Sequence, residues 1–172
     1  FPAPTQGLAS LMTLAIFERL GVKNCESFDY LHSIVEATKQ AFLVRDRIIG
    51  DPAHMIEKAE DYLGPAKLDE LAAKIDRKRA LPWPYPANPG DTVWLGAIDK
   101  NGTAVSFIQS IYFEFGSGCV LENSGIVWQN RGSSFVLDGY GPRALRPGKK
   151  PFHTLNPAMA LFDDGRRMVY GN

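Results

Sequence analysis

The sequence predicts an α+β fold in which a helical half precedes a half built of β-hairpins. Three features of the 172-residue chain support this class: apolar residues recur at a helical period over about residues 1–80, prolines crowd residues 81–90, and apolar and polar residues alternate from Thr92 onward. With 45% hydrophobic residues, the chain can bury one ordinary globular core. We therefore expect helices that cover stacked antiparallel sheets.

Two helices are expected before residue 52. Thr5 can cap the first helix and Gly21 can end it, whereas Ser27 can cap the second, which Gly50 and Pro52 end. Helical spacing predicts the following core positions: Leu8, Leu11, Met12, Ala15, Ile16 and Leu20 in the first helix, and Leu31, Ile34, Val35, Thr38, Ala41 and Phe42 in the second. The charged run Arg45–Arg47 is expected on the helix surface or in ion pairs.

A third helix is expected over about residues 67–76, with Leu68, Leu71, Ala72 and Ile75 facing the core. The proline-rich run 81–90 then predicts an extended linker, because proline removes backbone donors and holds the chain open.

The first β-hairpin has two candidate registers. A two-residue turn at Asn101-Gly102 would pair Thr92 with Ile111, whereas a three-residue loop, Lys100–Gly102, would pair Thr92 with Ser110. Only the second register gathers the apolar residues on one face, namely Val93, Leu95, Ala97, Val105 and Phe107. Because a slip of one residue exchanges the two faces, we expect the three-residue loop and a hydroxyl beside that of Thr92.

The rest of the chain is expected to hold short strands and polar loops. Residues 115–119 read as a glycine-rich turn, 124–128 as a strand that leads into a polar loop, and 147–157 as irregular structure. The segments M-A-L-F and R-R-M-V-Y, joined by D-D-G, predict a second hairpin.

Composition excludes several classes of function. Nineteen basic residues balance nineteen acidic ones, which gives no electrostatic basis for binding nucleic acid or an anionic membrane. No apolar run approaches the ~20 residues of a membrane span. Cys25, Cys119 and the three histidines show no metal-ligand spacing, so no metal site is expected. The two cysteines are expected to be buried free thiols.

Four segments, in order, resemble the gamma-glutamyltransferase family of N-terminal-nucleophile hydrolases, especially its acylase-like members. They are F-P-A-P-T-Q-G-L-A-S-L; H-S-I-V-E-A-T-K-Q-A-F-L-V-R-D-R with the following G-D-P; D-T-V-W-L-G-A-I-D-K-N-G-T-A-V-S; and the run F-G-S-G, S-G-I-V-W-Q-N-R-G-S-S-F, P-G-K-K-P-F-H-T-L-N-P. The resemblance covers nearly the whole chain. It implies part of an αββα sandwich and no cofactor, with residues 1–91 ending the large-subunit region and residues 92–172 beginning the small-subunit region.

The resemblance also implies a nucleophile. The family cleaves its own chain at the position that matches Asp91–Thr92, and Thr92 matches the residue that then attacks the substrate, with its free α-amine as the general base. Ser110 matches a hydroxyl position, usually Thr, that hydrogen-bonds near the nucleophile.

The substrate-binding positions depart from those of typical transpeptidases. Tyr112 stands where an Asn contacts the amine of the nucleophile, Arg131 and Ser134 stand where an amide or acid and then an Asp hold the substrate's α-amine, and His153-Thr154 replaces a Ser-Ser pair. Arg131 would repel an ammonium group and suits a carboxylate. We therefore expect hydrolysis of an acyl amide that ends in a carboxylate, as in glutaryl-type substrates, in preference to an ordinary γ-glutamyl donor.

Val93 and Trp94 also differ from the Thr-His pair that typical transpeptidases carry after the nucleophile.

The expected function is an autoprocessing amidohydrolase or acyltransferase that acts on a γ-glutamyl or glutaryl-like amide.

The alternative is a non-catalytic relative or an inactive fragment, since the family's oxyanion-hole glycines lie a few residues beyond a G-N like Gly171-Asn172. The implied partners are the small-molecule substrate and the remaining parts of both subunits, and a homo-oligomer stays open.

Overall fold

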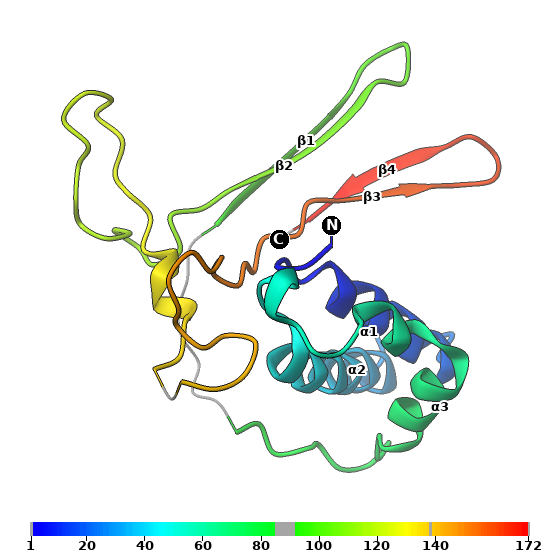
Figure 1. Cartoon of the computed structure of the whole chain (residues 1–172). Coiled ribbons are helices and arrows are strands. Elements are labelled where there is room, and N and C mark those ends of the chain that lie inside the picture. The colour runs from blue at the N-terminus through cyan, green and yellow to red at the C-terminus, as the bar shows by residue number, and fades with distance from the viewer. Residues whose placement is uncertain (1, 85–91, 138, 172) are drawn as a thin grey trace.

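The chain forms a helical layer and two hairpins on one side of it (Figure 1). The computed structural model describes residues 2–84, 92–137 and 139–171. Its elements are α1 (Gly7–Arg19), α2 (Phe28–Ile48), η1 (Pro52–His54), η2 (Ala59–Leu63), α3 (Pro65–Ala73), β1 (Val93–Ile98), β2 (Ala104–Gln109), η3 (Arg131–Ser134), β3 (Ala158–Leu161) and β4 (Arg167–Tyr170). The α+β prediction is confirmed. The expected autocleavage residue Asp91 and most of the proline-rich linker lie outside the described residues.

Local capping explains where the first helices begin and end. The Ser27 hydroxyl accepts a hydrogen bond from the Tyr30 N–H at 3.1 Å, as predicted for an N-cap. Gly21, with φ +65°, ends α1 as predicted. The predicted cap lies one residue early: Gln6 is the N-cap of α1 and makes no capping side-chain bond. The Thr5 hydroxyl donates to the Pro2 carbonyl at 2.9 Å and accepts from the Gly7 N–H, the first of the helix, at 3.4 Å.

The core lies between α1, α2 and α3, with apolar side chains spaced as the helical period predicts. Met12 and Ile16 of α1 are fully buried, and Leu68 and Leu71 of α3 are nearly so. Leu11, by contrast, is 53% exposed and lines an open cavity beside α1.

The predicted core face of α2 is wrong in part. Ala41 is buried and Phe42 packs against the core, as predicted. Leu31 and Val35, however, are more than half exposed, and Glu36 and Ala37 are buried instead. Alanine lets α1 approach α2 closely, and the buried Glu36 carboxylate is compensated by hydrogen bonds from Lys39 Nζ at 2.7 Å and the Leu81 N–H at 3.0 Å. Leu31 and Val35 therefore lie on the side of α2 that faces away from the core.

The first hairpin has the predicted register. Leu95 pairs with Phe107 and Ala97 with Val105, which requires the three-residue loop, and Gly102 has the left-handed φ of +83°. Asp99 Oδ1 accepts hydrogen bonds from two N–H groups of the loop at 2.8 Å each.

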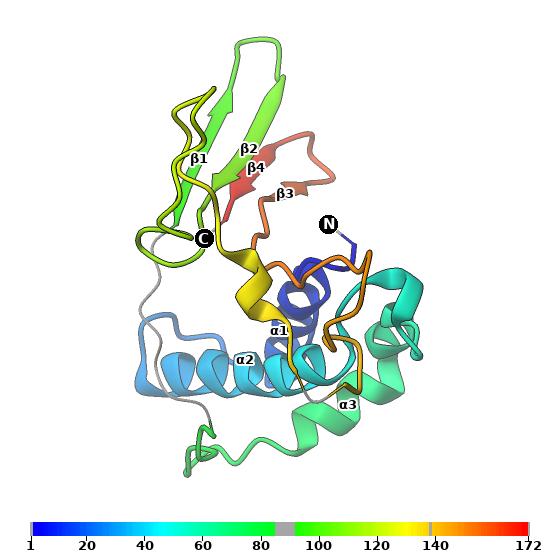
Figure 2. The same ribbon diagram turned by 60° about the vertical axis from the view of Figure 1, so that its left-hand side comes forward.

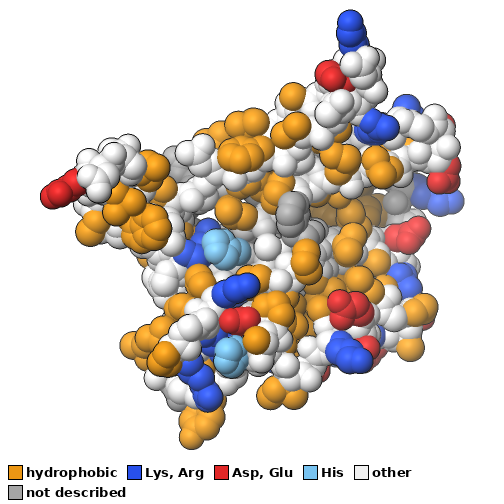
Figure 3. Space-filling view, turned by 45° about the horizontal axis from the view of Figure 1, so that its top comes forward, with side chains coloured by type: hydrophobic (Ala, Val, Ile, Leu, Met, Phe, Trp, Pro, Cys, Tyr) orange, Lys and Arg blue, Asp and Glu red, His pale blue; other side chains and the backbone are white. Residues whose placement is uncertain are grey.

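The apolar face of this hairpin is exposed, with Val93 60% and Phe107 47% accessible. Figure 3 shows hydrophobic side chains spread widely over one face of the molecule. The opposite face of the hairpin packs toward the second one: Trp94 Nε1 donates to Ser106 Oγ at 2.9 Å, and that hydroxyl donates to the Tyr170 carbonyl at 3.1 Å.

The predicted strand at 124–128 is wrong. This segment forms a single isolated bridge, Val120 to Val127, because tight glycine turns flank it. The glycine-rich turn at 115–119 is confirmed, with Gly116 and Gly118 both at positive φ. The second hairpin, β3–β4, is confirmed as well.

Both cysteines are exposed, so the prediction of buried thiols is wrong. Each lies in a turn at the surface and not on a packed helix or strand face. In the part of the chain that the structure describes, no helix has both the length and the apolar character to cross a bilayer. Within the same residues, no three His, Cys, Asp or Glu side chains are grouped to hold a metal ion.

Candidate active site

The start of β1 brings two hydroxyl groups together. Thr92 lies opposite Ser110 in the hairpin register, and its Oγ1 donates to Ser110 Oγ at 3.1 Å. The Tyr112 N–H donates to the same oxygen at 3.0 Å, so Ser110 accepts two hydrogen bonds. A pocket of about 360 Å³ opens beside this pair; Val93, Gln109, Ile111 and Glu114 complete its lining.

Tyr112 has an unusual backbone conformation. Its φ is +81°, which costs an L-residue roughly 1–2 kcal/mol. This turn aims the Tyr112 N–H back at Ser110 while its ring lies under the Arg131 guanidinium, 3.9 Å from carbon to ring centroid. The ring also stacks on Phe113, with centroids 4.7 Å apart. Tyr112 therefore touches both the hydroxyl pair and the predicted substrate-binding arginine.

Arg131 is a buried cation at the start of η3, with only 2% of its surface exposed. Its Nη1 donates to Thr154 Oγ1 at 3.1 Å, and the Tyr112 ring covers it. Burial lowers the pKa of Arg131 from its ordinary value, yet a guanidinium stays charged near neutral pH. No carboxylate of residues 2–84, 92–137 or 139–171 forms an ion pair with it.

His153 and Thr154 lie next to Arg131, which donates a hydrogen bond to Thr154. Burial, and then the charge of Arg131, lowers the pKa of His153, so this imidazole is neutral at pH 7. The His153 N–H donates to the Pro4 carbonyl at 2.9 Å, and Ser134 Oγ donates to the Phe152 carbonyl at 3.1 Å. The Ser134 hydroxyl thus supports the neighbouring backbone in this structure.

The structure therefore brings five of the predicted site residues into one connected set. Thr92 and Ser110 form one end, Arg131 and Thr154 form the other, and Tyr112 joins them. Figure 2 shows η3, in yellow, between the β1–β2 hairpin and the helices.

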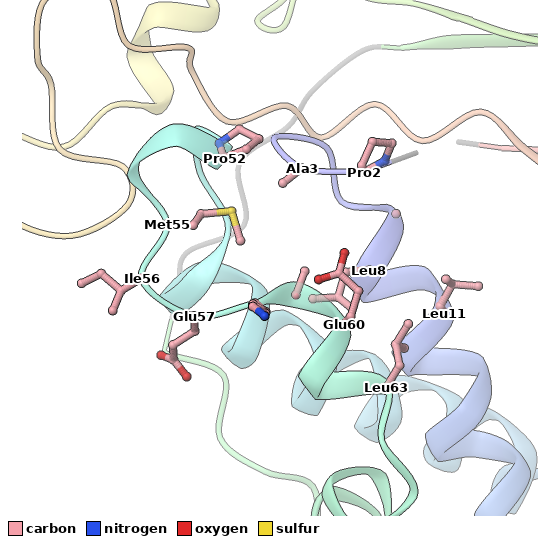
Figure 4. Close-up of a pocket in the computed structure, with 13 residues that line it drawn as sticks. Pro2, Ala3, Leu8, Leu11, Pro52, Met55, Ile56, Glu57, Glu60 and Leu63 are labelled. Carbon is pink, nitrogen blue, oxygen red and sulfur yellow. The ribbon is translucent and has the colours of Figure 1, made fainter.

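A separate apolar cavity of about 600 Å³ lies against α1 (Figure 4). Its labelled lining includes Leu8, Leu11, Met55 and Leu63. None of the predicted site residues lines it, so this cavity is distinct from the pocket beside the Thr92–Ser110 pair.

With this geometry in place, the comparisons with known proteins decide the family. The family model described as gamma-glutamyltranspeptidase matches residues 1–172. The chain belongs to the gamma-glutamyltranspeptidase family. It is 55% identical to an oxamate amidohydrolase proenzyme of Klebsiella pneumoniae subsp. pneumoniae, over 98% of this chain and 32% of that protein. It is 41% identical to a glutathione hydrolase-like YwrD proenzyme of Bacillus subtilis, over 99% of this chain and 33% of the relative.

The fold has a solved counterpart. A crystal structure of cephalosporin acylase from Bacillus halodurans matches with a TM-score of 0.78 and 37% identity, covering 90% of this chain and 28% of the acylase. The predicted N-terminal-nucleophile hydrolase fold is confirmed, and the chain forms part of it. It spans about a third of the length of the curated relatives it matches.

Sequence reasoning missed two residues that hold the site of this gamma-glutamyltranspeptidase family member together. Asn130 Oδ1 accepts from the Phe113 N–H at 3.1 Å, and Gln129 Oε1 accepts from the Arg131 N–H. The Asn130 bond ties the start of η3 to the turn after β2, whereas the Gln129 bond is local and holds the backbone of Arg131. The signal was present as the polar pair Q-N directly before Arg131.

Proposed function

We propose that this chain carries the nucleophile and the acyl-recognition residues of an autoprocessing amidohydrolase. The observation that carries the proposal is the buried Arg131 cation, which has no ion-pair partner among the described residues and is linked through Tyr112 to the Thr92–Ser110 pair. A buried charge without a compensating partner is costly. A substrate carboxylate would supply that partner.

The nucleophile chemistry follows from an N-terminal threonine. Once the Asp91–Thr92 bond is cleaved, the free α-amine of Thr92 takes the proton of its own hydroxyl, and Oγ1 attacks the amide carbonyl. The amine leaving group departs with a proton, and water then hydrolyses the acyl ester. Ser110 contributes by fixing the position of the Thr92 hydroxyl, at 3.1 Å.

The proposed substrate is a small amide whose acyl part carries a carboxylate. Oxamate is the first compound to test, because one relative is named oxamate amidohydrolase. In oxamate, a carboxylate adjoins the amide carbonyl. A glutaryl amide is a longer compound of the same type. A γ-glutamyl donor also carries an ammonium group, which Arg131 would repel.

The first test uses the full-length parent protein and its Thr92→Ala variant. Intact mass and N-terminal sequencing should find a new terminus that begins T-V-W-L in the wild type and an uncut chain in the variant. An uncut wild-type chain without turnover would favour the alternative of a non-catalytic relative.

The second test compares kcat/KM on oxamate, a glutaryl anilide and a γ-glutamyl anilide. Arg131→Met should lower kcat/KM for carboxylate-bearing amides about 100-fold, the upper range for a lost charge-assisted hydrogen bond. Arg131→Lys should retain part of the activity, because it keeps the charge without the planar fork. A clear preference for the γ-glutamyl compound would overturn the proposed specificity.

A further inference from the structure

The segment that carries His153 and Thr154 is anchored by the C-terminal end of α2 and the turn after it. Arg143 Nη2 donates to Asp46 Oδ1 at 2.8 Å, and the Lys150 N–H donates to Asp51 Oδ2 at 2.8 Å. Both contacts join the helical half to the half after Thr92. The expectation that Asp46 is a helix-surface charge or ion-pair member therefore resolves into a specific long-range ion pair.

Asp46 holds two arginines at once. Arg45 Nε donates to the same Oδ1 at 2.8 Å, and the three side chains are each less than a fifth exposed. Arg143 Nε also donates to the Ile49 carbonyl at 3.3 Å, and its guanidinium lies over the Phe152 ring, 4.0 Å from the centroid. Asp46 thereby fixes an arginine that in turn fixes Phe152.

Asp51 is buried and uses both carboxylate oxygens. Oδ1 accepts from the Ala53 N–H at 3.1 Å, which caps η1, and Oδ2 accepts from the Lys150 N–H. At the adjacent Gly50, an added Cβ would lie 2.1 Å from the Pro142 carbonyl oxygen, so only glycine permits this close backbone contact. The two segments are packed backbone against backbone at this point.

These anchors lie directly before the predicted substrate-binding pair. Lys150 precedes Phe152 by two residues, and the Phe152 carbonyl accepts from Ser134. The next residue, His153, is held by the Pro4 carbonyl, and Thr154 accepts from Arg131. A shift of the segment at Asp46 or Asp51 would therefore move the hydroxyl that orients Arg131.

We propose that Asp46 and Asp51 are positioning residues for acyl-group recognition. They set segment 150–154, and through Thr154 they set the direction of the Arg131 guanidinium, without touching the substrate. This inference rests on the proposed function in that Arg131 binds the substrate carboxylate. It adds that the helical half controls this binding from the other side of the Asp91–Thr92 bond.

The experiment compares Asp46→Asn and Asp51→Asn in the full-length parent, with Asp69→Asn as the matched control. Asp69 forms an exposed ion pair with Arg19 at 2.6 Å, far from segment 150–154 in the chain. Each of the first two variants should raise KM for oxamate about tenfold and change kcat less than about threefold. This pattern is expected when one charge-assisted hydrogen bond to the bound substrate is lost. The control should leave both constants unchanged.

A second measurement does not depend on turnover. Hydrogen exchange in the uncut Thr92→Ala background should become about tenfold faster at residues 150–154 in both variants, and at those residues more than in the core of α1 and α2. Equal exchange in variants and control would overturn the positioning role, as would unchanged KM in an active enzyme. If the wild type turns over none of the three amides, the proposed function fails, while the exchange result still decides whether Asp46 and Asp51 hold segment 150–154 in place.

A double variant tests whether Asp46 acts through Arg143 or the variants merely lose stability. Asp46→Asn combined with Arg143→Gln should cost no more in kcat/KM than the worse single variant, because each single change already breaks the Asp46–Arg143 ion pair. Additive losses would show that the two residues act separately and would contradict the proposal. Asp46→Glu, which keeps the charge, should have a KM between those of the wild type and Asp46→Asn.

Discussion

Tyr112 combines a strained backbone with two contacts inside the candidate site. Its left-handed φ of +81° directs the N–H to Ser110 and the ring to Arg131. Strain of this kind persists only where the surroundings enforce it. The enforcing contacts are the Arg131 guanidinium above the ring and Phe113 beside it.

Replacement of Tyr112 separates the backbone effect from the ring effect. Tyr112→Ala and Tyr112→Gly both lose the ring, but glycine tolerates positive φ, so Tyr112→Gly should be more stable than Tyr112→Ala by about 1 kcal/mol. Tyr112→Phe should keep kcat/KM within about twofold, since the ring contact with Arg131 remains. Thermal unfolding and kinetics check both statements; equal stability of the alanine and glycine variants would contradict the strain argument.

At the scale of elements, the start of α2 depends on its N-cap, and the face that α2 buries depends on its packing against α1. Ser27 satisfies the Tyr30 N–H at 3.1 Å. The 21-residue helix then buries a side with polar and small residues against α1 and leaves Leu31 and Val35 outside.

Loss of the α2 cap should destabilise the chain measurably. Ser27→Ala should lower the free energy of unfolding by about 1 kcal/mol, because it leaves an N–H at the helix start without its acceptor. Ser27→Asp should restore most of this loss, since aspartate caps as well as serine does. Denaturant unfolding followed by far-UV circular dichroism measures the difference, and a neutral Ser27→Ala would show that water replaces the cap.

These elements show what sequence patterns can predict. The hairpin register and the Thr92–Ser110 pair were predictable, because loop length and face alternation are local and agree with each other. The α2 face was not, because α2 has apolar residues on two sides and only packing with α1 chooses between them. The contact of Arg131 with Tyr112 was also unpredictable, since it depends on the left-handed turn after β2.

At the scale of the whole molecule, the contacts of Asp51 make the stability of the docking between the two halves depend on pH. Hydrogen bonds from the Lys150 and Ala53 N–H groups lower the pKa of Asp51 below its ordinary 3.8, and nearby His54 acts in the same direction. For a lowered carboxyl pKa, the unfolded chain binds more protons, so the stabilisation is present above pH 3.8 and is lost as the pH falls through the folded value.

This coupling gives a testable pH dependence. The wild type should exceed Asp51→Asn in melting temperature near pH 6, and the difference should shrink as the pH falls below about 4. Thermal melts at a series of pH values measure it. A difference that stays constant down to about pH 3 would mean that the Asp51 charge does not contribute.

The ion pair and hydrogen bond of Asp46 and Asp51 also have a consequence for synthesis on the ribosome. The partners of these carboxylates follow 97 and 99 residues later in the chain. At typical elongation rates, about 5–20 s pass between the synthesis of the two carboxylates and that of these later partners. The proposed acyl-recognition region can therefore take shape only after residues 142–156 have been synthesised and have docked on the helical half.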